Sequence, residues 1–324
     1  MKTMIKTAGA ASLLALAVAG NSAVAAPAFS TLYFDQNAGW DPSTAQFLPG
    51  GTGLTGLVFS GATDAEAPAG TQTNMAWSSP LNGNTSSISI TSFDSGDSPS
   101  IAGDPDNPFI PTDANGTWDA GEWWVIDRLI QENQTLSVNG SSIPNPLWIA
   151  DTLANLFIYT DAAETDLLLS DLNSKVTIEF WETLNSDPDG DPLCPASPAP
   201  LGTACDDVYR VAAFDFDPIF AVRDGFKYTF EFDLLPGPSR DEDDNIVGVT
   251  LVCSALSPCV DQNGDAIDTG EEIWVFTPEF NPGTSELNIR MRFAVSEIPE
   301  PSILGLMGLG MLGLGFAARR RKQS

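Results

Sequence analysis

Two segments of this chain alternate apolar and polar residues almost without a break. Across 226–234, Phe, Tyr and Leu occupy every second position, and Lys, Thr, Glu and Asp stand between them. Across 287–295, Leu, Ile, Met, Phe and Val alternate with Asn, Arg, Arg and Ala. Successive side chains of a strand point to opposite faces of a sheet, so this period of two predicts strands with one buried face.

Weaker segments of the same kind are Leu54–Ser60, Ser86–Phe93, Lys175–Glu182, Val208–Phe216, Ile246–Cys253 and Glu272–Phe276. Pro, Gly, Asn and Asp cluster between them, as turns require. Many short antiparallel strands with long acidic loops predict a mostly β chain, with a single β-sandwich of jelly-roll type over residues 27–296. Only Leu147–Tyr159 and Ala163–Leu172 have apolar runs compatible with a helix.

The N-terminus has the features of a secretory signal peptide over residues 1–26. Lys2 and Lys6 are followed by an apolar run from Ala8 to Val18 and then by small residues up to Ala26. A positive start, a short apolar stretch and an A-x-A exit are typical of an exported chain. We expect cleavage after Ala25 or Ala26.

The C-terminus, residues 297–324, has three parts in a fixed order. Pro299, Glu300 and Pro301 precede an apolar stretch from Ile303 to Ala318. A cluster of Arg319, Arg320, Arg321 and Lys322 ends the stretch. As a helix, the 16 apolar residues measure about 24 Å, somewhat less than a hydrocarbon core of about 30 Å. The basic cluster is expected on the cytoplasmic side, with the rest of the chain outside.

This tail resembles the PEP-CTERM sorting signal. The resemblance implies that a membrane protease, exosortase, reads the Pro-Glu-Pro motif at 299–301 in a Gram-negative bacterium that makes exopolysaccharide. It implies transient residence in the inner membrane, followed by the cell surface or the extracellular matrix. An ordinary C-terminal anchor that is never cut is the alternative.

The net charge of the exported part limits the classes of partner that it can bind. Residues 27–298 hold 8 Lys and Arg against 42 Asp and Glu, a net charge of −34. Nucleic acid and anionic lipid surfaces are therefore excluded as partners, because both require clustered basic side chains. The chain has no His, which removes Ser-His-Asp and Cys-His catalysis. Such acidity favours divalent cations and neutral or basic partners.

The four cysteines are Cys194, Cys205, Cys253 and Cys259. An even count in an exported chain predicts disulfides. Nearest-neighbour pairing, Cys194–Cys205 and Cys253–Cys259, is the favoured one of three connectivities. A zinc site is the alternative, although no C-x-x-C spacing is present.

Three acidic loops are candidate sites for a bound Ca²⁺ ion. Asp261, Asn263, Asp265 and Glu272 fall at positions 1, 3, 5 and 12 of an EF-hand-like loop, but Ala266 replaces the usual Gly. A second loop offers Asp113, Asn115, Asp119 and Glu122, and a weaker one spans 187–191. The same residues also favour turns without any metal.

The middle of the chain resembles the THxN group of PEP-CTERM proteins. The resemblance rests on Trp77-Ser78-Ser79-Pro80, the stretch from Glu182 to Asp207, and the second cysteine pair before Thr277-Pro278-Glu279. The name-giving Thr-His-x-Asn stands here as Ile130-Gln131-Glu132-Asn133, which keeps only the Asn. The resemblance implies location and architecture, and no chemistry.

Three functions remain open at this point. The favoured one is a non-enzymatic surface or matrix protein that associates with exopolysaccharide or biofilm and binds calcium or glycans. Of the eight tryptophans, Trp118, Trp123 and Trp124 beside the acidic loop are the preferred exposed platforms for a sugar ring. A secreted polysaccharide hydrolase that uses two carboxylates is the second function. A periplasmic protein permanently anchored in the inner membrane is the third.

Overall fold

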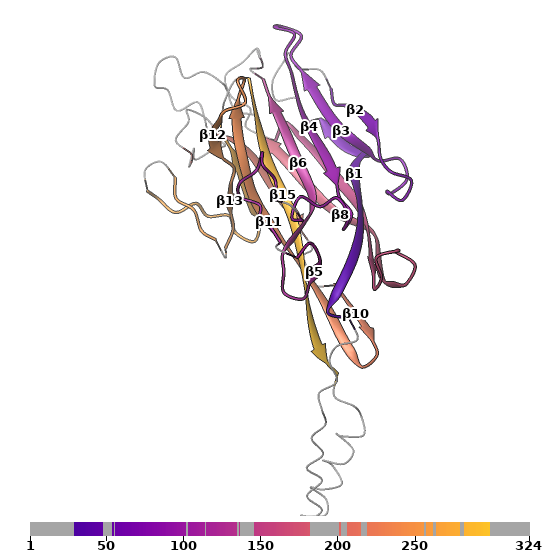
Figure 1. The fold of residues 1–324 in the computed structure, drawn as a ribbon. Helices are drawn as coiled ribbons and strands as arrows, with labels where there is room; N and C mark the ends of the chain where they lie inside the picture. The colour runs from indigo at the N-terminus through magenta and orange to yellow at the C-terminus, as the bar shows by residue number, and fades with distance from the viewer. Residues whose placement is uncertain are drawn as a thin grey trace, which may run out of the picture.

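The computed structural model describes residues 29–47, 54, 56–101, 103–113, 115–134, 136, 146–181, 201, 206–214, 219–255, 257–261, 264–278 and 282–298. The described chain is built of strands (Figure 1). They are β1 Thr31–Phe47, β2 Val58–Ala62, β3 Gln72–Ser78, β4 Thr85–Ser92, β5 Trp118–Asp119, β6 Trp124–Asn133, β7 Trp148–Tyr159, β8 Leu167–Trp181, β9 Asp207–Phe214, β10 Ile219–Arg223, β11 Phe226–Asp241, β12 Ile246–Val249, β13 Leu251–Cys253, β14 Ile273–Thr277 and β15 Gly283–Glu297.

The two strictly alternating segments lie in β11 and β15, and the prediction of strands there is confirmed. The two strands pair with each other in antiparallel register, with Phe230 opposite Phe293 and Phe232 opposite Met291. Phe230, Met291 and Phe293 are fully buried. The charged residues between them form pairs on the other face, such as Arg292 with Glu231.

The two segments that are compatible with a helix, 147–159 and 163–172, are not helical. The first segment is β7, and the second runs from a turn into β8. Burial in β7 follows period two at Trp148, Ala150, Leu156 and Ile158. β7 pairs with β1 on one side and β8 on the other, so pairing on both edges decides its conformation. Five strands lie outside the segments predicted as strands or considered as helices: β1, β3, β5, β6 and β10.

The expected two-sheet sandwich is wrong, although the mostly antiparallel β class is confirmed. The strands form one continuous curled sheet, a half-barrel, in the order β10-β11-β15-β6-β4-β3-β1-β7-β8-β9-β14-β13. The junction between β3 and β1 is a single register pair, Trp40 with Gln72. A sequence cannot reveal this junction, because side-chain alternation is the same for strands of one sheet and of two.

One short segment links strands from the two ends of this order. Residues 246–249 pair with β11 as β12, and residues 251–253 pair with β14 as β13. Thr250 stands between the two and donates its N–H to the Gly237 carbonyl at 3.0 Å. A Cβ at Gly237 would lie 2.7 Å from the Glu286 carbonyl oxygen, so this close approach of β11 to β15 requires glycine.

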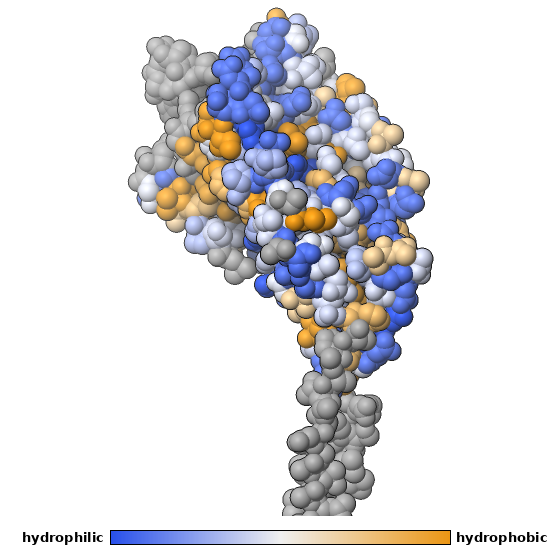
Figure 2. Space-filling view, in the orientation of Figure 1, coloured by the Kyte–Doolittle hydropathy of each residue, from blue (hydrophilic) through white to orange (hydrophobic). Residues whose placement is uncertain are grey.

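The concave side of the sheet holds two hydrophobic clusters. One gathers around Trp40, Trp77, Trp148 and Phe180, and the other around Phe34, Trp118, Phe230 and Phe293. A third, smaller cluster includes Trp181, Val208 and Phe276 and lies on the opposite face of β8, β9 and β14. On the surface, the side seen in Figure 2 is largely hydrophilic with smaller apolar areas.

Candidate functional site

Several predicted site residues lie outside the described residues. They are the signal peptide 1–26, Cys194, Cys205, Asn263, the loop 187–191, the motif Pro299, Glu300 and Pro301, the stretch 303–318 and the cluster Arg319, Arg320, Arg321 and Lys322. Within the part of the chain that the structure describes, no helix has the length and apolar character needed to cross a membrane. The chain reaches the tail directly from β15, which ends at Glu297.

The candidate calcium loop that contains Asp113 and Glu122 is held together by its own hydrogen bonds. Asp113 accepts from the Thr117 N–H at 2.9 Å, and Asp119 accepts from the Asn115 amide at 2.9 Å. Glu122 accepts from the Asp119 N–H at 2.9 Å, and Thr31 also donates to Asp119. The structure thus brings Asp113, Asn115, Asp119 and Glu122 together, but as a polar turn.

In the candidate calcium loop that contains Asp261 and Glu272, these two side chains bond to different partners. Asp261 accepts from the Asp265 N–H at 2.9 Å. Glu272 instead accepts from the Trp274 indole N–H at 3.0 Å. Among the described residues, no three His, Cys, Asp or Glu side chains gather where they could hold a metal ion. Calcium at either loop stays a prediction.

Cys253 and Cys259 form a disulfide, with their Cα atoms 5.5 Å apart. This is the second of the two predicted pairs. Cys253 is fully buried in the small outer cluster with Trp181, Val208 and Phe276. The bridge closes the loop that leaves β13.

The tryptophans beside the acidic loop are not open platforms. Trp118 and Trp124 are 1% exposed, so their expected exposure is wrong. Trp118 packs edge-on against Phe293, with ring centroids 4.7 Å apart. The Arg290 and Arg292 guanidinium groups lie 4.8 and 4.6 Å from the Trp123 ring centroid. These side chains belong to the packing of the sheet and its strands.

On the outer face, Arg210 of β9 contacts two aromatic rings. Its guanidinium lies 4.2 Å from the Trp181 ring centroid and 3.9 Å from that of Trp274. Burial raises the pKa of the nearby Glu179 carboxyl, and repulsion from Glu272 adds to that rise. The two rings stack on a cation, which stabilises the packing of β8, β9 and β14.

The segment 130–133, which resembles a degenerate Thr-His-x-Asn, lies in β6. Gln131 and Asn133 both point inward, and each donates its amide to Asp207 Oδ2 at 3.0 Å. All three side chains are almost fully buried. Residues from β6 and β9 are thereby joined across the inside of the curled sheet.

A cavity of about 570 Å³ lies inside the sheet, lined by members of both large clusters. Its walls are mostly aliphatic and come from β1, β4, β6 to β11 and β15. They include Ile90, Ile126, Ile178 and Leu234. Cavities of several hundred Å³ with a few polar groups are the usual form of small-molecule sites. None of the site residues predicted from the sequence is among the residues that line this cavity.

The polar centre of the cavity is the pair Gln36 and Asp127. The Gln36 amide nitrogen donates to Asp127 Oδ2 at 2.8 Å, and the Ser92 hydroxyl donates to Asp127 Oδ1 at 2.6 Å. Gln36 is 6% exposed and Asp127 is 3% exposed. Burial raises the pKa of Asp127 to about 7, although the hydrogen bonds from Ser92 and Gln36 oppose the rise.

A β-bulge aims Asp127 inward. In the ladder with β15, Ile289 pairs with Asp127 and the next residue, Arg290, pairs with Val125. The extra residue reverses the alternation, so that Ile126 and Asp127 both line the cavity. The sequence does contain an acidic residue next to an apolar one, Asp127 beside Ile126. This pair indicates a bulge only once β6 is known to be a strand.

Across the cavity, β8 has a second bulge. The register with β7 shifts between Ala154 and Asn155, opposite Asn173, whose φ of 59° is left-handed. Asp171, Ser174 and Lys175 around this bulge line the cavity. The Lys175 side chain is 56% exposed and forms an ion pair with Asp151 at 3.2 Å. The cavity therefore reaches the surface beside β8.

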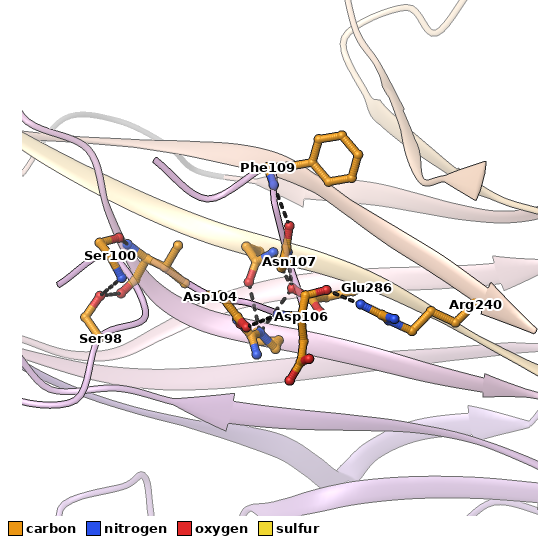
Figure 3. Close-up of polar contacts among 11 residues, drawn as sticks. Ser98, Ser100, Asp104, Asp106, Asn107, Phe109, Arg240 and Glu286 are labelled. Atoms are coloured by element: carbon orange, nitrogen blue, oxygen red, sulfur yellow. Dashed lines mark hydrogen bonds and ion pairs between the residues drawn. The ribbon is translucent and has the colours of Figure 1, made fainter. Parts of the chain in front are cut away.

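The outer face of β6 carries a polar network that pins the loop between β4 and β5 (Figure 3). Arg128, the neighbour of Asp127, bonds to Asp104 at 2.5 Å and to Glu286 at 3.1 Å. Asn107, which is fully buried, donates to Glu286, and Ser98 donates to the Val125 carbonyl at 2.8 Å. This network lies on the outer face of β6 and holds in place the strand segment whose inner face carries Asp127.

Comparison with known proteins gives one result. Residues 297–322 match the PEP-CTERM protein-sorting motif. The motif marks the chain as an exported protein that exosortase sorts to the cell surface. None of the curated proteins and none of the solved structures matches the chain. The THxN resemblance of the middle region stays a prediction.

Proposed function

We propose that this chain is a non-enzymatic surface or matrix protein that exosortase releases from its membrane tail. The observation that carries the proposal is the sorting motif at 297–322. It follows directly on β15, so the folded sheet is what processing leaves at the cell surface. Association with exopolysaccharide or biofilm is part of the proposal.

The charge of the folded part agrees with this role. The net charge of −34 over residues 27–298 favours solubility and contacts with neutral or cationic material. The described carboxylates are largely engaged in turns and ion pairs, as with Asp113 and Glu231. In this proposal, calcium bridges such a surface and the matrix.

The first test is the C-terminus of the chain recovered from its own cells. Mass spectrometry should find a terminus near residues 299–301, and Glu300→Ala should leave the whole tail in place. Glu297→Ala is the matched control, because Glu297 is exposed and lies outside the Pro-Glu-Pro sequence at 299–301. A wild-type chain that retains residues 303–322 would instead establish a permanent inner-membrane anchor.

The second test separates binding from hydrolysis. The processed chain is incubated with exopolysaccharide from its own cells, and retention and new reducing ends are both measured. Retention without new reducing ends is expected. Release of reducing ends would establish the hydrolase, and lack of retention would remove the glycan part of the proposal.

A further inference from the structure

We propose that the cavity inside the curled sheet binds a neutral, largely aliphatic small molecule through one hydroxyl or N–H group that donates to Gln36 Oε1. This inference is independent of the proposed sorting function. It rests on the cavity, on one unpaired buried oxygen, and on an opening to the surface.

The size of the cavity exceeds any ordinary packing defect. Protein interiors are packed as densely as organic crystals, and voids larger than a water molecule are few. A space of about 570 Å³ lies within the range of small-molecule sites. It separates the two large clusters, since Ala38 and Leu129 belong to one and Ile126 and Leu156 to the other.

The polar centre of the cavity has one oxygen that is available to accept a hydrogen bond from a ligand. Both carboxylate oxygens of Asp127 already accept a hydrogen bond, from Gln36 and from Ser92. The Gln36 amide oxygen is buried and has no hydrogen-bond partner among the residues that the structure describes. A buried acceptor without a donor is costly, so a donor group on a ligand would be favoured at this place.

The surroundings select the rest of the ligand. Ile90, Ile178, Leu234 and the other aliphatic walls favour an apolar body. A carboxylate is disfavoured, because Asp127 lies beside the acceptor and the exported part carries a net charge of −34. The charged groups at the cavity walls are Asp127 on β6 and Asp171 and Lys175 on β8. Lys175 and Asp171 stand at the opening, where a ligand would enter.

The test compares two isomers in calorimetric titrations of the chain recovered from its own cells. 1-Octanol carries a hydroxyl donor, and its isomer 1-methoxyheptane has the same atoms but no donor. We expect 1-octanol to bind about tenfold more tightly, the ratio that a single hydrogen bond of about 1.4 kcal/mol provides. Gln36→Leu should make the two affinities equal.

Two further variants locate the binding. Ala154→Phe fills the cavity from β7 and should abolish binding of both isomers while far-UV circular dichroism stays unchanged. Leu172→Ala is the matched control, since Leu172 is exposed on β8 and does not line the cavity. Equal affinities in the wild type, absence of binding, or octanol binding that survives Ala154→Phe would each overturn the assignment. If the Gln36→Leu variant does not fold, the comparison of the two isomers in the wild type still tests whether a donor group is required.

Discussion

Gln36 and Asp127 are 91 residues apart in sequence and joined side chain to side chain at 2.8 Å. They lie on β1 and β6, which are not neighbours in the sheet order. The bond spans the chain segment that follows β4, because the Gln36 N–H donates to the Phe93 carbonyl at 3.3 Å and the Phe93 N–H donates to the Ile126 carbonyl at 2.9 Å. It places a carboxyl group of raised pKa at the polar centre of the cavity, and that group makes the first prediction possible.

Asp127 should make the protein less stable as the pH rises from 4 to 7. The folded state keeps the proton up to a pKa of about 7, whereas the unfolded chain releases it near pH 4. The contribution of Asp127 to the free energy of unfolding is thus fully present below pH 4. It falls by up to about 4 kcal/mol as the pH rises through 7. Asp127→Asn should remove this component from urea unfolding measured across that range. An unchanged pH profile would show that Asp127 is ionised in the fold.

The Arg128 network should contribute stability with the opposite pH dependence. Burial opposes ionisation of Asp104, but backbone N–H groups and Arg128 outweigh it and lower the pKa of that carboxyl. Arg128→Met should cost about 2–3 kcal/mol at pH 7 by urea unfolding, and less as the pH falls through the lowered pKa. Limited proteolysis should then cut the loop 94–117 first. Arg128→Lys serves as the control that keeps the charge and loses the forked contacts.

The stacking of Arg210 should depend on its planar shape. Arg210→Lys keeps a cation between Trp181 and Trp274 but loses the flat guanidinium, and should cost about 1–2 kcal/mol of unfolding free energy. Tryptophan fluorescence should shift at the same time, because both rings lose a stacked partner. A lysine variant as stable as the wild type would mean that charge alone matters here.

The Cys253–Cys259 bridge should stabilise the outer cluster. Chain entropy for so short a loop predicts a loss of about 2 kcal/mol when both residues are replaced by Ser. Denaturant unfolding of the Cys253→Ser/Cys259→Ser variant measures it. The Cys194→Ser/Cys205→Ser variant is the comparison, and a mass shift on alkylation reports whether that second pair is bridged.

The sequence predicted the strands whose alternation is complete and missed those whose alternation is interrupted. β11 and β15 alternate over their apolar stretches, and both were found. β6 changes phase at its bulge, and β1 places Gln36 and Asn37 side by side in a buried stretch. Asp127 could not be selected from 42 carboxylates, because its burial results from pairing with distant strands.

The number of sheets could not be predicted from the sequence, because it also depends on contacts between distant strands. Trp40 with Gln72 is the one register pair between β3 and β1, and β1 also bonds to the segment after β4, where the Gln36 N–H donates to the Phe93 carbonyl. The segment 246–253 links β11 to β14. Both depend on how far the strands curl, which no local pattern encodes. The tail needed no tertiary information, since its three parts are read from the chain in order.

The position of β15 has a mechanical consequence. The last strand lies between β6 and β11, and the tail continues from its end. A pull on the tail along the strand loads both flanking ladders in shear, so many hydrogen bonds resist together. An edge strand in the same place would peel away one bond after another. While the tail is held, the domain is therefore tethered through one of its most firmly paired strands.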